Sequence, residues 1–164
     1  MAKTDLNRER ADALVAVYGR WIGVRDAHLD EKGDRAFGGV GFHHALGDDV
    51  LQCRVLIEKG YALNDSENIR EKFRAVARAL ADPTIGGMFE RGGGRIVLDE
   101  EKRTFFLIYD FELGGVASLE FRAKVEDLID IGAHWTLRWF SQVARVAHGV
   151  APRPGQFTQR PSSG

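Results

Sequence analysis

Hydrophobic residues in the first segment recur at the spacing of one face of a helix, and they predict a helix over about residues 5–21. The turn-forming run Asp30-Glu31-Lys32-Gly33-Asp34 follows closely, so a strand around 27–29 has room for only a few residues. The apolar positions of the helix are Leu6, Ala13, Leu14, Val17, Tyr18 and Trp21.

Two strands are expected next, over about 35–46 and 49–58, with a turn at Gly47-Asp48-Asp49 between them. Apolar and other side chains alternate in the second strand, which is typical of a sheet with one face on a hydrophobic core. The residues of that apolar face are Leu51, Cys53, Val55 and Ile57.

A second helix is predicted over about 65–81, where helical spacing of apolar residues ends at Asp82-Pro83. A glycine-rich connection over 84–94 then leads to a second hairpin, with strands over 95–98 and 103–113.

The last segment predicts one long helix that Ser118 can cap and that runs to about His148. The residues after Gly149 include Pro152, Pro154 and Pro161, a composition typical of a disordered tail. The apolar stripe of the long helix consists of Phe121, Val125, Leu128, Ile129, Trp135, Trp139, Val143 and Val146.

The elements therefore follow the order helix, strands, helix, strands, helix. Tight hairpins leave no room for parallel crossovers, so we expect an α+β fold with a mostly antiparallel sheet and three helices packed on it. We expect a single domain over 1–149 and a disordered tail over 150–164.

Composition and charge restrict the kind of partner. The chain has 164 residues, 44% hydrophobic and 29% charged, with a formal net charge of −1, and no basic stripe with interleaved aromatics is visible. We expect no nucleic-acid partner.

The charged N-terminus lacks the apolar stretch of a signal peptide, and no run approaches the ~18 apolar residues of a membrane span. With one unpaired Cys53, these features predict a cytoplasmic protein without membrane insertion.

The sequence gives little support for a catalytic or metal-binding site. Neighbours on a strand point to opposite faces, so His43 and His44 cannot bind one metal ion together. Cys53 lies across the predicted hairpin from His43 or a neighbour and could form a Cys–His dyad, but its place on the apolar face favours a buried, inert thiol. Asp130 and His134 could supply half of a metal site, and nothing supplies the other half.

Two further groups of residues that could suggest a functional site fall in predicted loops or turns. Gly92-Gly93-Gly94 leads into a strand at Arg95 rather than a helix and lacks a phosphate-binding pattern. The carboxylates of Asp99, Glu100 and Glu101 fall where a hairpin turn is expected. We therefore predict no catalytic residue, metal or cofactor, and a binding protein rather than an enzyme.

Apolar surface exceeds what one small core requires. The strand over 103–113 carries apolar residues on both faces, and Trp135, Trp139 and Phe140 add more. Helices of one chain usually cover one face of such a sheet, which predicts that another molecule covers the remainder. The residues of the strand are Phe105, Phe106, Leu107, Ile108, Tyr109 and Phe111.

Several stretches resemble the type III secretion chaperones of the Tir-chaperone class, relatives of the YbjN-like domains. The resemblance lies in residues 14–24 with the turn at 29–33, in 94–99, in the strand over 105–111 and in the closing segment 119–139. It implies a cytoplasmic homodimer that binds the N-terminal region of a secreted effector in extended form and keeps it secretion-competent, without a cofactor.

The resemblance also implies which residues make contacts. The effector would lie along the first helix and the first strands, and the dimer would form through the middle helix and neighbouring strands. By position, the implied effector-binding residues are Val17, Trp21, Val24, Phe37, Val40 and Phe42. The implied dimer-interface residues are Phe73, Val76, Ala77 and Leu80, with Phe106 and Ile108.

Two alternatives stay open at this stage. One is a YbjN-like domain that binds a regulatory protein partner, and the other is a small-molecule-binding α+β protein whose pocket lies between the sheet and the helices.

Overall fold

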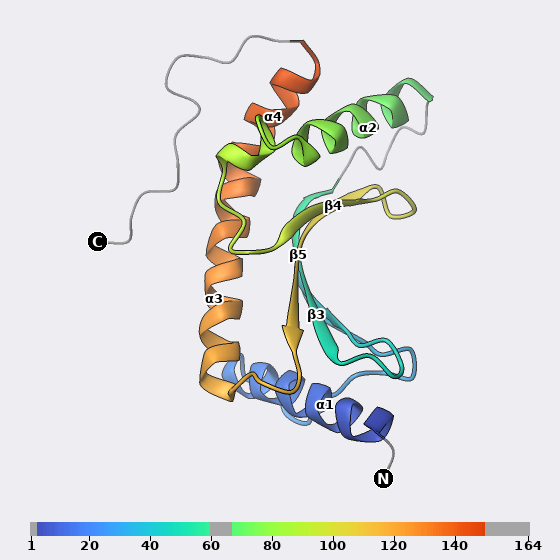
Figure 1. Ribbon diagram of the computed structural model, residues 1–164, viewed down its shortest axis with the longest axis vertical. Coiled ribbons are helices and arrows are strands. Elements are labelled where there is room, and N and C mark those ends of the chain that lie inside the picture. The colour runs from blue at the N-terminus through green and yellow to red at the C-terminus, as the bar shows by residue number, and fades with distance from the viewer. Residues whose placement is uncertain (1–2, 60–66, 150–164) are drawn as a thin grey trace, which may run out of the picture. The chain divides into compact units, whose positions relative to one another are not determined.

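The computed structural model describes residues 3–59 and 67–149 (Figure 1). Its elements, in chain order, are α1 (Lys3–Trp21), β1 (Asp34–Phe37), β2 (Val40–His43), β3 (Val50–Lys59), α2 (Glu67–Ala81), the short 3₁₀ helix η1 (Gly86–Met88), β4 (Arg95–Asp99), β5 (Thr104–Glu112), α3 (Ser118–His134), the π-helical turn η2 (Trp135–Trp139) and α4 (Phe140–Ala147).

The strands form one five-stranded sheet in the order β1-β2-β3-β5-β4. Both β1 and β3 pair with β2 in antiparallel fashion. The predicted α+β class, with helices alternating with antiparallel strands, is confirmed. Strands β1 and β4 are the edges of this sheet, so each has one side without a neighbouring strand among the described residues.

The region predicted as one strand over 35–46 is a hairpin instead. Strands β1 and β2 are joined by Gly38 and Gly39, and Phe37 pairs with Val40. Gly38 has φ +64°, a conformation that hairpin turns need and that glycine adopts without steric cost. The strand expected around 27–29 is absent: Ala27 and Leu29 are buried, but the Leu29 N–H donates to the Asp12 carboxylate (2.9 Å) rather than to a strand.

The long final helix is interrupted. A π-helical turn separates α3 from α4, and both Trp135 and Trp139 of this turn are buried. Among the described residues, no helix is both long and apolar enough to cross a membrane.

Backbone contacts divide the chain into two compact units. Unit 1 comprises Met1–Val55 and Ile108–Ile129, and unit 2 comprises Leu56–Leu107 and Asp130–Gly164. Strands β3 and β5 contribute residues to both. The single domain over 1–149 stays a prediction, as does the disordered tail, because 150–164 lie outside the described residues, as do the first two residues of the predicted helix over 65–81.

The core of unit 1 forms where α1 and the start of α3 pack on the sheet. Phe42 of β2 packs against Tyr18 of α1, and Phe111 of β5 packs against Phe121 of α3, with ring centroids 5.2 and 4.7 Å apart. The alternating face of β3 is buried as predicted, with Cys53 opposite Phe42 in the register.

The core of unit 2 is richer in aromatic rings. Phe89 lies 5.6 Å from both Trp135 and Trp139, and Phe105 of β5 contacts Phe73 of α2 and Phe140 of α4. Helices α2 and α4 pack against each other in this unit (Figure 1).

Most of the apolar residues that the sequence predicts to exceed one core are enclosed within the chain. Phe105, Leu107, Ile108 and Phe111 are buried, as are both tryptophans of the π-helical turn. Only Phe106, Tyr109 and Phe140 of this set stay half-buried. The aromatic content by itself therefore does not require a second molecule, contrary to the expectation from the sequence.

Candidate functional site

An aromatic patch in unit 1, made of Tyr18, Trp21 and Phe37, combines buried and accessible rings. Tyr18 is buried, and its ring touches Trp21 of the same helix (5.5 Å) and Phe37 of β1 (5.1 Å). Trp21 and Phe37 themselves are only half-buried. Desolvation, with a smaller contribution from Cys53, raises the pKa of the Tyr18 phenol. The buried ring thus supports two partly exposed ones.

Two arginines cover the exposed rings. The Arg35 guanidinium carbon lies 5.0 Å from the centre of the Phe37 ring, and that of Arg122 lies 4.8 Å from the Trp21 ring. These are cation–π distances, and each arginine comes from a different element, β1 or α3. Arg35 could have been noticed in the sequence, because residues two apart on a strand share a face. Nothing local in the sequence relates Arg122 to Trp21.

Of the six predicted effector-binding residues, four retain accessible surface and two do not. Val17, Trp21, Val24 and Phe37 are half-buried. Val40 and Phe42 are buried, with Phe42 only 2% exposed because it packs between Tyr18, Phe37 and Phe121. Phe42 therefore supports the patch from below and does not form its surface.

The predicted dimer-interface residues divide in the same way. Phe73, Val76 and Leu80 of α2 are buried within the chain, while Ala77 and Phe106 are half-buried. Ile108 is buried and belongs to unit 1, whereas the other five belong to unit 2. Ala77 and Phe106 are thus the accessible members of this set.

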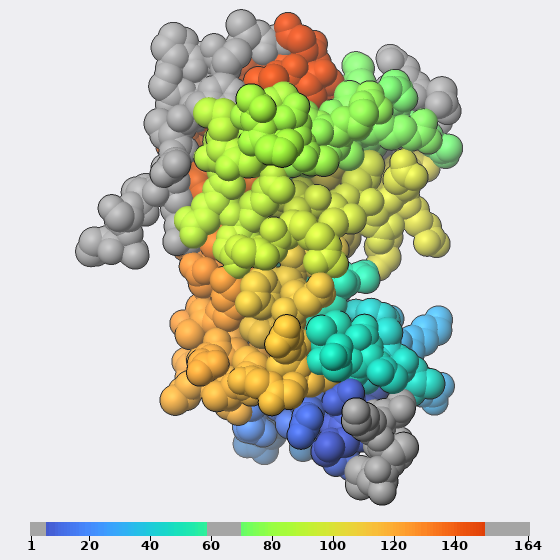
Figure 2. Space-filling view, viewed as in Figure 1, coloured from blue at the N-terminus to red at the C-terminus, as the bar shows by residue number. Residues whose placement is uncertain are grey.

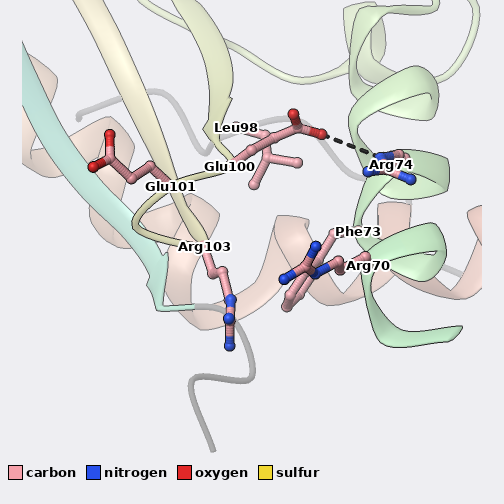
Figure 3. A pocket seen from close by; sticks show the side chains of 7 residues that line it. All are labelled: Arg70, Phe73, Arg74, Leu98, Glu100, Glu101 and Arg103. Carbon is pink, nitrogen blue, oxygen red and sulfur yellow. Dashed lines mark hydrogen bonds and ion pairs between the residues drawn. The ribbon is translucent and has the colours of Figure 1, made fainter. Parts of the chain in front are cut away.

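A cavity of about 280 Å³ lies between α2 and the turn that joins β4 to β5. Figure 3 shows Arg70 and Arg74 reaching from α2 toward this turn, and Glu101 pointing away from the helix. Arg74 Nε lies 3.2 Å from Glu100 Oε1, an ion pair that connects α2 to the turn. Figure 2 shows α2 (green) and the turn (yellow) on the same face of the molecule. Phe73, Leu98 and Arg103 also line the cavity.

A second cavity of about 300 Å³ lies between α2 and α4. Its wall includes the apolar side chains of Val76 and Phe140 together with Glu58 at the end of β3. Burial raises the pKa of the Glu58 carboxyl, because a charged carboxylate loses solvation there. This is the kind of mixed pocket that a side chain of a partner or a small molecule can enter.

The Cys–His dyad considered from the sequence does not form. Cys53 pairs with Phe42 in the register and His43 with Gln52, so the thiol and the His43 ring point to opposite faces. Burial raises the pKa of the Cys53 thiol to about 12, and at neutral pH it carries almost no thiolate.

The two histidines have separate structural roles. His43 Nδ1 lies 2.6 Å from the Asp34 carboxylate across the hairpin. His44 is fully buried, and its Nε2 lies 2.9 Å from the Asp48 carbonyl, which can only accept, so Nε2 donates. The His44 carbonyl also packs on Gly33, where a Cβ would clash with its oxygen.

Of the remaining candidates from the sequence, Glu100 and Glu101 line the cavity beside α2, whereas His134 and Asp99 do not. The His134 ring stacks on Trp139 at 5.2 Å, and Asp99 accepts a hydrogen bond from the Lys102 N–H inside the turn. Within the described part of the chain, no three His, Cys, Asp or Glu side chains gather closely enough to hold a metal ion.

Comparisons with known proteins find similarity only at the level of structure. No family model matches the sequence, and no curated protein matches it. A chain in the crystal structure of the ExsC–ExsE complex is similar, with a TM-score of 0.54 and 19% identity over 83% of this chain and 95% of that chain.

A chain in the structure of the HopA1–SchA chaperone–effector complex is similar with a TM-score of 0.52 and 12% identity, over 80% of this chain and 96% of that chain. At these identities the likeness concerns the fold. The chain therefore has the same α+β fold as these two chains.

Proposed function

We propose that this protein is a cytoplasmic chaperone of type III secretion, which acts as a homodimer and binds the N-terminal region of a secreted effector in extended form. Binding keeps the effector segment unfolded and competent for secretion. The proposal extends to this chain the kind of partner named for the HopA1–SchA complex. Membership of the Tir-chaperone class and the relation to YbjN-like domains are part of the proposal.

One observation carries the proposal: the half-buried rings of the aromatic patch lie beside the edge strand β1, whose outer side has no neighbouring strand among the described residues and is bonded at Asp34 to Asp30. Phe37, one of those rings, belongs to the edge strand β1 itself. An extended polypeptide can add a strand to such an edge through main-chain hydrogen bonds and place alternate side chains against the apolar patch. A surface that offers both is suited to an unfolded segment rather than to a folded partner.

The geometry also explains why the client would stay extended. Each residue that joins the edge gives up about 1–2 kcal/mol of backbone entropy, which apolar anchors and main-chain hydrogen bonds must offset. Trp21, Phe37 and the neighbouring Val17 and Val24 provide the apolar contact area. The client segment then buries its apolar side chains on this surface instead of in a core of its own.

Co-expression provides the direct test. We expect a stable complex between the chain and the N-terminal region of an effector encoded with the same secretion system, and no complex with the rest of that effector. Limited proteolysis of the complex should leave the chaperone and the bound segment intact and degrade the free segment. A complex that forms equally well with the folded part of the effector would refute the proposed role.

The dimer needs its own test, because Phe73 and Leu80 are buried within the chain and an aspartate there would disrupt the fold first. Ala77 and Phe106 are better positions. We expect light scattering to show a dimer for the unmodified chain and a monomer for Ala77→Asp combined with Phe106→Asp, with unchanged circular dichroism. Leu137→Asp, at a highly exposed position of unit 2, is the control and should stay dimeric.

A further inference from the structure

Both exposed rings of the aromatic patch carry an arginine on one face. Arg35 lies over Phe37, and Arg122 lies over Trp21. Cation–π attraction holds each guanidinium over its ring, and the planar guanidinium offers its N–H donors to an acceptor beside it. The rings and the two positive charges therefore form one surface.

The carboxylates around these arginines do not saturate them. Arg122 has Glu126 as an ion-pair partner in the described residues, at 3.9 Å, which is too long for a hydrogen bond. The Nε of Arg35 is buried, and no described group accepts a hydrogen bond from it. Asp34 and Asp30 line a cavity together with Arg35: Asp34 is bound by His43, and the Asp30 carboxylate accepts from the Lys32 and Asp34 N–H groups. Neither guanidinium is therefore held by a short hydrogen bond to a carboxylate among the described residues.

We propose that the aromatic patch selects acidic client segments, in which an Asp or Glu stands two residues from an apolar anchor. The inference rests on the proposed function and defines the chemistry of its client. Arg35 and Phe37 stand two apart on one face of the edge strand β1. Asp34 at the start of β1 is bonded to Asp30, so a strand would be added at Ala36, whose main-chain groups face away from β2. Such a strand would place residues of the same spacing opposite Arg35 and Phe37, at about 5 Å between Cβ atoms. The carboxylate then meets Arg35, and the apolar side chain meets Phe37. Arg122 provides a second contact where the client passes Trp21.

An acidic peptide fits this surface better than a nucleic acid. Bases bind proteins by stacking on open ring faces. Here a guanidinium already occupies one face of each accessible ring, and Tyr18 contacts both rings from within the patch. The formal net charge of −1 provides no general attraction for phosphates either.

Fluorescence anisotropy with three short labelled peptides tests the inference on the full-length protein. The peptides share a Leu-rich extended sequence and differ at alternate positions, which hold Asp, Asn or Lys. We expect the Asp peptide to bind at least about tenfold more tightly than the Asn peptide, and the Lys peptide to bind most weakly. The preference should shrink as salt rises, because both arginines are partly exposed.

Substitutions of the two arginines test whether these residues cause the preference for the Asp peptide. Arg35→Gln and Arg122→Gln should each weaken binding of the Asp peptide about threefold to tenfold and leave the Asn peptide within about twofold. Arg35→Lys keeps the charge and should restore part of the loss. Arg138→Gln, an exposed arginine of unit 2, is the matched control and should change nothing. Circular dichroism checks that each variant is folded.

The outcomes separate the inference from the proposed function. Equal binding of the Asp and Asn peptides overturns the acidic preference but leaves apolar docking at the patch intact. Tighter binding of a single-stranded oligonucleotide than of the Asp peptide also overturns it. If no peptide binds while the co-expressed effector complex forms, both the preference and this location of the client site are wrong.

Discussion

The two units of the chain use the same kind of residue in opposite ways. In unit 2, Trp135 and Trp139 are enclosed, and the Trp135 indole N–H donates to the Glu90 carbonyl at 2.8 Å. In unit 1, Trp21 lies half-buried beneath a stacked Arg122. An enclosed ring with its polar group satisfied stabilises the fold, whereas a half-open ring at a sheet edge keeps contact area for a partner. Burial, rather than residue type, thus distinguishes the structural tryptophans from the proposed binding tryptophan.

The largest expected effect is on the stability of unit 2. Trp135→Ala removes a fully buried ring, so we expect the free energy of unfolding to fall by about 3–5 kcal/mol in chemical denaturation. Leu137→Ala, on the same turn but 84% exposed, is the control and should change it by less than about 0.5 kcal/mol. If both variants lose the same stability, the enclosed cluster is not what holds unit 2 together.

The second prediction tests whether the core of unit 1, beneath the partly exposed aromatic patch, is as enclosed as the core of unit 2. The pKa of the Cys53 thiol is raised from 9.0 to about 12 in the folded chain. Between these values the unfolded chain loses a proton that the folded chain keeps, so stability should fall as pH rises, by at most about 1.4 kcal/mol per pH unit.

Denaturation at several pH values above 9 measures this slope. The Cys53→Ala variant lacks the thiol and should show a shallower loss of stability over the same range, although it starts from a lower value because it leaves a small cavity. Identical slopes in the two proteins would mean that the thiol reaches solvent.

Trp21→Ala should separate binding from stability. We expect affinity for the effector segment to fall at least about tenfold, as for a central aromatic anchor, while the free energy of unfolding falls by only about 1 kcal/mol. Anisotropy and denaturation on the same sample compare the two quantities. A loss of stability as large as that of Trp135→Ala would place Trp21 in the core and remove the contrast between the units.

The smallest effect concerns surface charge in unit 2. Glu100→Gln removes the exposed ion pair with Arg74, and we expect less than about 1 kcal/mol of destabilisation. Thermal unfolding in low and high salt measures it, and the difference from the unmodified chain should vanish in high salt. A larger loss would show that the turn at Glu100 anchors α2.

Local patterns were sufficient for most elements. Alternation over residues 51–57 predicted both β3 and its buried face, and the spacing of apolar residues predicted the bulk of α1, α2 and α3. The hairpin at Gly38 and Gly39 could also have been predicted, because two glycines between Phe37 and Val40 are a turn signal. The prediction of one longer strand over 35–46 missed this signal. Ala27 and Leu29 alternate like a strand, but they are buried because Asp12 of α1 anchors that segment.

Features that depend on contacts between distant parts of the chain could not be predicted from the sequence. The π-helical turn coincides with contacts to distant parts of unit 2: Trp135 and Trp139 are enclosed there, and Thr136 Oγ1 lies 2.9 Å from the Ile57 carbonyl. The stacking of Arg122 on Trp21 likewise joins residues a hundred positions apart in the chain. Of the candidate site, the sequence indicated Trp21 and Phe37 but neither arginine.

The amino-acid sequence alone predicted most of the helices and strands in their order, and the buried face of β3, because each depends on periodicity or spacing over a few residues. Tertiary structure decided which of the apolar residues are enclosed and which stay open. Phe42 and Phe37 look alike in the sequence, yet one packs among three rings and the other lies half-open on an edge strand. Exposure is a property of the assembled fold, since it depends on what α1 and α3 bring over each side chain.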